Sequence, residues 1–216
     1  MSHQSADELR EKRIAIMGQD LGAIFDSLYN EILWIKFKWI EYVELYGTSE
    51  ERIDVMNRSA PWLFFIVQRT LFDDILLGLA KIMDPPGVGN KETVSILALS
   101  QFINDTDLKK KVSKYIKEIK TNTEFCRDWR NRQIAHKDRK LAIGHKTAIP
   151  LIPSNRKSVE DALNSIEKLV RELELHYFKS ATAFEVLVSD RGAGTLFPLL
   201  GDGLKYRDLE DRDLLL

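Results

Sequence analysis

Residues 13–46 read RIAIMGQDLGAIFDSLYNEILWIKFKWIEYVELY, and apolar side chains recur in this segment every three or four positions. That spacing places them along one face of an α-helix. Upstream, Ser5 and Glu8 have the separation of a helix capping box, and Gly47 is a typical stop. We therefore predict one long helix over residues 7–46.

Helical periodicity also dominates the rest of the chain. Ser59 and Pro61 indicate the start of a second long helix, which ends at residues 84–87, DPPG. We expect a short helix over about 94–104, a motif helix over about 105–141, and a last long helix capped by Ser158 and Asp161. No alternating strand pattern is present. The sequence therefore predicts an all-α fold, an antiparallel helical bundle of about five principal helices.

The domain organisation follows from the same pattern. The bundle is expected to occupy residues 1–190 as a single domain. Residues 191–216 contain four glycines and predict an irregular tail, with Leu196, Phe197 and Leu199 folded onto the bundle.

Composition excludes several classes of protein. The 216 residues are 44% hydrophobic and 30% charged, which is typical of a globular domain and not of a disordered chain. The lone Cys126 cannot form an internal disulfide, and a reducing cytoplasm is the expected compartment. The longest apolar run has 8 residues, too few for a membrane span, and residues 1–13 lack the apolar region of a signal peptide. The four histidines fit no metal-binding spacing, so we expect neither a metal site nor a cofactor.

Positive charge is concentrated in one segment. Residues 105–140 hold 12 lysines and arginines against 6 acidic residues, in a chain whose net charge is −1. Lys110, Lys114 and Arg127 in this segment are candidate contacts for RNA phosphates. A solvated lysine face is the alternative interpretation.

The motif helix ends in residues 129–138, WRNRQIAHKD. His136 can transfer a proton near neutral pH, and Arg130 offers a planar fork for phosphate. With Asn131 as an orienting polar group, these are candidate catalytic residues for phosphodiester cleavage without a metal. Arg132 and Lys137 are further candidate RNA-binding cations.

Two observations temper this interpretation. His136 continues an apolar stripe, so it could be a core histidine or serve the helix dipole. On an ideal helix, Arg130 and His136 lie about 120° and about 9 Å apart. Either the helix loosens before His136, or the two residues meet across a two-fold interface.

The pattern of Arg130, Asn131 and His136 resembles the signature of the HEPN superfamily, in the branch associated with bacterial abortive infection. Residues 69–85, RTLFDDILLGLAKIMDP, are similar to the second motif of that branch. The resemblance implies a bundle that dimerises through its motif helices and a metal-independent endoribonuclease that acts as a toxin or phage-defence effector. It also implies alternatives, since other members are non-catalytic interaction or nucleotide-binding modules. The expected partners are RNA, a second copy of the chain, and an antitoxin or a nucleotidyltransferase.

Overall fold

A computed structural model describes residues 5–89, 91–187 and 192–211. Their contacts divide the chain into two compact units. One comprises Met1–Ile35 with Leu76–Glu185, and the other Lys36–Ile75 with Val186–Leu216. Both boundaries near residues 35 and 75 fall inside long helices, α2 (Gln19–Tyr46) and α4 (Pro61–Lys81), so each helix contributes to both units.

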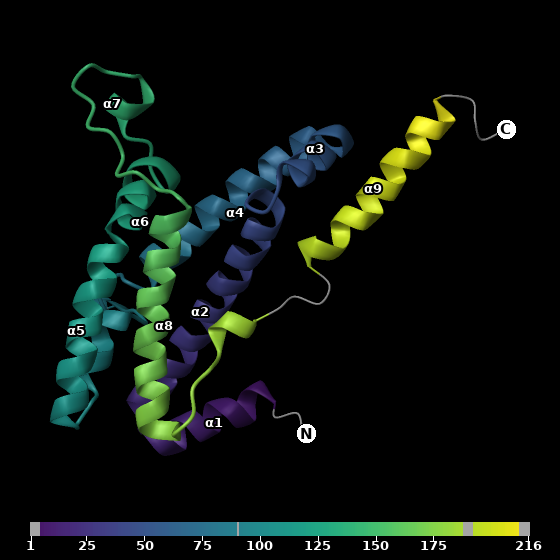
Figure 1. Ribbon diagram of the computed structural model, residues 1–216. Helices are drawn as coiled ribbons and strands as arrows, with labels where there is room; N and C mark the ends of the chain where they lie inside the picture. Colours follow the sequence, from purple (N-terminus) through teal and green to yellow (C-terminus); the bar gives the residue numbers. More distant parts are fainter. Residues whose placement is uncertain (1–4, 90, 188–191, 212–216) are drawn as a thin grey trace. The chain divides into compact units, whose positions relative to one another are not determined.

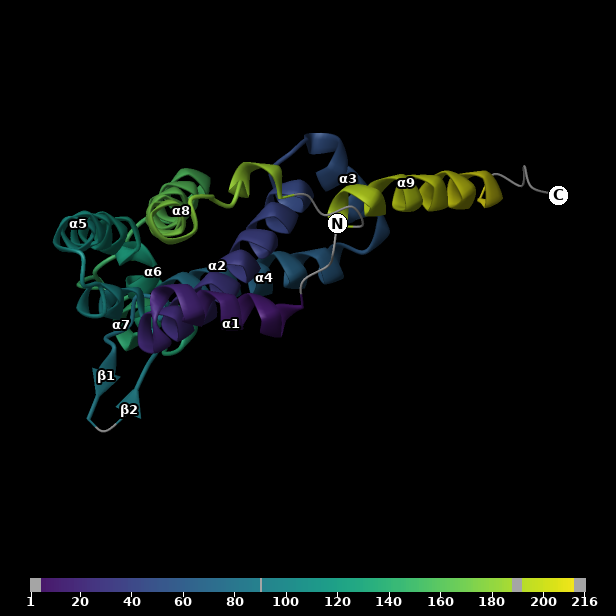
Figure 2. The same ribbon diagram turned by 90° about the horizontal axis from the view of Figure 1, so that it is seen from below.

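The predicted all-α fold is confirmed, with one small exception. The strands β1 (Gly87–Val88) and β2 (Lys91–Glu92) form a two-residue antiparallel hairpin after α4 (Figure 2). It follows the prolines that end α4, where the chain reverses direction. The expectation of no sheet at all is therefore wrong in this short segment.

The predicted long helix over residues 7–46 is divided in two. The capping box of Ser5 and Glu8 is present and begins α1 (Ala6–Met17), but Gly18, with φ of +89°, separates α1 from α2. A Cβ on Gly22 would lie 2.6 Å from the Cα of Ile14. Only glycine at position 22 therefore permits this close approach of α1 to the first turn of α2.

In the first unit, α5 (Thr106–Asn122) packs antiparallel against α8 (Arg156–Phe178), as Figure 1 shows. The cross-contacts give the direction, because Lys111 bonds Glu172, Lys168 bonds Glu118 and Asn122 bonds the carbonyl of Asp161. The core contains fully buried side chains from α4, α5, α8 and the 3₁₀ turn η1 (Ile96–Gln101), among them Leu79, Ile96, Val112, Ile119, Ile166 and Leu173. The cap of α8 is Asn155, paired reciprocally with Ser158, and not Ser158 with Asp161 as predicted.

In the second unit, α3 (Glu50–Ser59) and α9 (Ala193–Glu210) contribute to a small core that includes Leu45, Met56 and Phe64. The prediction of an irregular tail is wrong, because residues 193–210 are helical despite Pro198 and three glycines. Leu196, Phe197 and Leu200 pack against the core with helical spacing, and the Glu41 carboxylate accepts the Ala193 N–H. Leu199, expected to be folded inward, is exposed.

Candidate functional site

The predicted motif helix is a series of shorter segments. Thr123 separates α5 from α6 (Glu124–Trp129). The chain then continues directly from α6 into a π-helical turn, Arg130–Ile134. There the Ala135 N–H bonds the Arg130 carbonyl at 2.8 Å, and the Asp138 N–H bonds the Arg132 carbonyl at 2.9 Å. The helix therefore widens before His136, which is the first of the two alternatives raised by the spacing of Arg130 and His136. Such π-helical turns are frequent at functional sites.

Arg130 is anchored by an acidic residue from a distant part of the chain. Its Nη1 lies 2.5 Å from Oδ1 of Asp84, which follows α4. Both side chains are partly accessible, Arg130 at 32% and Asp84 at 26%. Arg127 donates to the Met83 carbonyl at 2.7 Å and lies 3.9 Å from the same Oδ1. Asp84 therefore fixes the place of the guanidinium while leaving part of it open to a ligand.

Sequence reasoning missed Asp84 as a site residue. The available signal was its place at the end of residues 69–85, immediately before Pro85. The ion pair joins residues 46 positions apart, so the fold had to be known to find it.

Asn131 and His136 are both exposed. Within the described part of the chain, neither side chain has a hydrogen-bond or ion-pair partner. The exposure excludes a core role for His136 in this chain. Lys137 is also exposed. The end of the motif helix thus presents Asn131, His136 and Lys137 to solvent, beside an arginine that is held in place.

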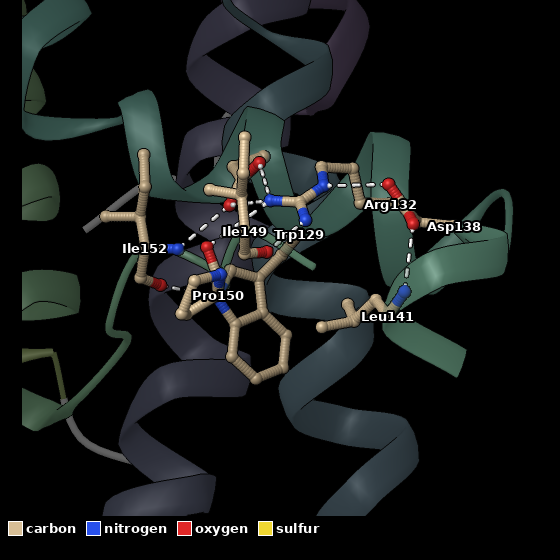
Figure 3. Close-up of polar contacts among 8 residues, drawn as sticks. Trp129, Arg132, Asp138, Leu141, Ile149, Pro150 and Ile152 are labelled. Atoms are coloured by element: carbon tan, nitrogen blue, oxygen red, sulfur yellow. Dashed lines mark hydrogen bonds and ion pairs between the residues drawn. The ribbon is translucent and has the colours of Figure 1, made fainter. Parts of the chain in front are cut away.

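Arg132 occupies a different environment, shown in Figure 3. Its guanidinium lies 3.1 Å from Asp128 and 3.4 Å from Asp138, and it also donates to the carbonyls of Ile149 and Pro150. The hydrogen bond to Asp128 raises the pKa of Arg132. These partners satisfy the hydrogen-bonding capacity of the guanidinium within the protein. Arg132 therefore has a structural role, in which it joins α6 to the segments that follow it.

Two further contacts join α6 to the loop between α7 and α8, which contains Ile149, Pro150 and Ile152. The Asp128 carboxylate accepts the Ile152 N–H at 2.8 Å, and the Trp129 indole N–H donates to the Ile152 carbonyl at 2.8 Å. Asp138, the other acidic partner of Arg132, is the N-cap of the short helix α7 (Arg139–Ala142). The Leu141 N–H, donating to this carboxylate, lowers the pKa of Asp138. The segment that carries His136 is therefore framed by the π turn before it and this cap after it.

The basic face of α5 is hollowed into a shallow cavity of about 360 Å³. Its lining consists of Thr106, Lys109, Lys110, Ser113, Lys114 and Lys117. Lys110 lies 3.5 Å from Asp107, and Lys114 has no ion-pair partner among the residues described. Both predicted lysines therefore belong to one concave, positively charged surface.

The described residues give no support for a metal site, a cysteine nucleophile or a membrane-spanning helix. No three acidic, histidine or cysteine side chains gather there in a way that could hold a metal ion. Cys126 is fully buried, and burial raises the pKa of its thiol, so it is not an activated nucleophile. None of the described helices has the length and apolar composition needed to cross a bilayer.

A comparison with protein families matches a part of the chain that includes both quoted motifs. Residues 18–196 match the family AbiU2 of the HEPN proteins. No curated protein and no solved structure matches the chain. The match extends over most of the chain, from the start of α2 into α9, and it includes Asp84, Arg130, Asn131 and His136. The chain therefore belongs to the abortive-infection-associated HEPN family AbiU2.

Proposed function

We propose that this protein is a metal-independent endoribonuclease that acts as a toxin or phage-defence effector. One observation carries the proposal. Arg130 is held by Asp84 at a π-helical turn, and the exposed Asn131 and His136 follow within the same motif. Arg130 supplies a fixed cation, and His136, which has no partner among the described residues, supplies a group for proton transfer; phosphodiester cleavage needs both kinds of group.

The reaction uses the ribose 2′-hydroxyl as nucleophile. Its oxygen attacks the adjacent phosphorus, the bond from phosphorus to the 5′ oxygen breaks, and a 2′,3′-cyclic phosphate and a 5′-hydroxyl result. A neutral His136 accepts the 2′ proton or, when protonated, gives a proton to the leaving oxygen. Arg130 stabilises the negative charge on the phosphate in the transition state, and Asn131 orients the phosphate.

A homodimer supplies what one chain lacks, since each protomer brings a single His136 and the reaction needs both a base and an acid. Self-association is also supported by four exposed apolar side chains in the first turns of α4: Trp62, Leu63, Phe65 and Ile66. In the proposed homodimer the two motif helices meet, and the cleft draws on both chains.

The remaining cations have different roles in the proposal. Lys137, Arg127 and the lysine surface around Lys110 and Lys114 attract the RNA backbone. Arg132 positions the loop and the turn that carries His136, because Asp128 and Asp138 already occupy its guanidinium. We therefore assign Arg132 a positioning role in place of direct RNA contact.

The second candidate is a non-catalytic interaction or nucleotide-binding module, which pairs with a nucleotidyltransferase. One observation favours it: Asp84 neutralises Arg130, as in a structural ion pair.

Product chemistry separates the two candidates. RNA incubated with the protein in EDTA should yield 2′,3′-cyclic phosphate and 5′-hydroxyl ends, and an RNA with 2′-deoxyribose at the cleaved position should stay intact. Cleavage of the deoxy-substituted RNA would refute this mechanism.

The shared site has its own test. Each cleft is proposed to use the His136 side chains of both protomers, so wild-type protein mixed with His136→Ala protein and allowed to exchange protomers should lose more activity than dilution alone explains. Activity that falls only in proportion to the wild-type fraction, with exchange verified by mass spectrometry, would show that each site belongs to one chain.

A further inference from the structure

A cavity of about 490 Å³ opens in the first unit, beside the end of α4. It lies among η1, the last turn of α5 and the beginning of α6. Its apolar lining is formed by Ala80, Met83, Pro85 and Leu97, and its polar lining by Lys120, Thr121, Thr123, Glu124 and Arg127. The volume lies in the range of sites for small organic ligands.

The cavity adjoins the candidate site through shared residues. Met83 and Pro85 line it and flank Asp84, the anchor of Arg130. Arg127 lines it as well, at 3.9 Å from the Asp84 Oδ1 that Arg130 binds. A ligand seated in the cavity therefore lies next to the ion pair that fixes Arg130.

The lining separates into two kinds of chemistry. The apolar part suits a flat, weakly polar ring. On the polar part, neither Lys120 nor Glu124 has a partner in the described portion of the chain, so an ammonium and a carboxylate are available to a ligand. The hydroxyls of Thr121 and Thr123 donate to carbonyls of their own helix and need no partner from a ligand.

We propose that this cavity binds one nucleotide of the RNA, adjacent to the phosphate that Arg130 holds. The base lies against Ala80, Met83 and Leu97, where burial of apolar surface favours it. Glu124 accepts from an N–H on the base edge, and Lys120 and Arg127 face the phosphate of that nucleotide. The assignment deepens the proposed ribonuclease function and rests on it for the link to cleavage, whereas nucleotide binding itself is measurable without any cleavage.

The test is to block the cavity with Thr121→Trp. Thr121 is exposed, and its hydroxyl donates to the Lys117 carbonyl of its own helix, so the indole can occupy the opening without disturbing the core. Lys120→Glu is a second variant, which keeps the cavity open and reverses one charge. Thr70→Trp is the matched control, at an exposed helical threonine that does not line the cavity.

Binding of the four ribonucleoside monophosphates is measured by calorimetry on the full chain carrying His136→Ala. We expect at least one to bind, with affinity lowered about tenfold or more by Thr121→Trp and by Lys120→Glu and unchanged by Thr70→Trp. Absence of binding to the full chain, or equal binding to the blocked and control proteins, would overturn the inference.

Cleavage by the protein with His136 intact is assayed separately, which keeps the two proposals apart. Binding without cleavage would leave the nucleotide site standing and remove the nuclease. Cleavage without nucleotide binding would do the reverse. If both hold, Thr121→Trp should also change the base preference at the cut sites.

Discussion

The contact of Asp128 with the loop after α7 gives a prediction whose size follows from the structure. Asp128→Ala removes the acceptor of the Ile152 N–H, which lies 2.8 Å from the carboxylate. A hydrogen bond to a charged group contributes about 1.5–3 kcal/mol. Because the carboxylate is only 17% exposed, water cannot readily replace it as the acceptor of the Ile152 N–H. We therefore expect the free energy of unfolding to fall by about 2 kcal/mol. For a chain of this length that lowers the melting temperature by about 4–8 °C.

Asp128→Ala should also make the loop between α7 and α8 more mobile. With Asp128 absent, the contacts at Ile152 weaken and the exposed Lys146 should become a faster site of trypsin cleavage than in the wild type. Calorimetry and limited proteolysis with mass spectrometry measure the two effects. Asp161→Ala is the control, since its exposed carboxylate pairs with Lys157 along the surface of α8. An unchanged melting temperature and an unchanged rate of cleavage after Lys146 would refute the role assigned to Asp128.

Three other predictions concern packing, reactivity and RNA binding. Gly22→Ala should lower the free energy of unfolding in urea titrations by about 1–3 kcal/mol, because the new methyl group meets the backbone of Arg13 and Ile14. Gly201→Ala is the control, because among the described residues its methyl group would meet no atom within 4 Å outside its chain neighbours and its own helix backbone, and equal effects of the two changes would argue against the close approach. Since burial raises the pKa of the Cys126 thiol, thiolate is scarce at pH 8, and iodoacetamide should modify the folded protein far more slowly than the urea-unfolded one; equal rates would contradict this burial. Lys110→Glu combined with Lys114→Glu should weaken RNA binding and flatten its dependence on salt without changing the thermal melt, and an unchanged affinity would exclude this surface.

The helices were predictable from the sequence because apolar periodicity reports burial directly, but their ends were less so. A long stripe does not reveal that Gly18 adopts positive φ, since the apolar spacing continues in register on both sides of it. In α9, Pro198 and the glycines argued for irregular structure. The packing of Leu196, Phe197 and Leu200 outweighs those local preferences, and tertiary packing is invisible to a local pattern.

For the candidate site, the motif gave the residues but not their environment. The exposure of Asn131 and His136 agrees with a reactive role, whereas Arg132 has the same residue type as Arg130 and a different set of partners. Asp84 could not be assigned from sequence, because its ion pair with Arg130 joins two helix ends that only the tertiary fold brings together.

In the proposed function, His136 and Arg130 cleave RNA through its 2′-hydroxyl. The most direct measurement is the initial rate of cleavage of an end-labelled RNA in EDTA by wild-type protein, His136→Ala and His145→Ala. His145 is an exposed histidine outside the motif and serves as the matched control. We expect cleavage in EDTA, a rate lowered about 10²-fold or more by His136→Ala, and a wild-type rate for His145→Ala. Cleavage that is abolished by EDTA, or that His136→Ala retains in full, would contradict this proposal.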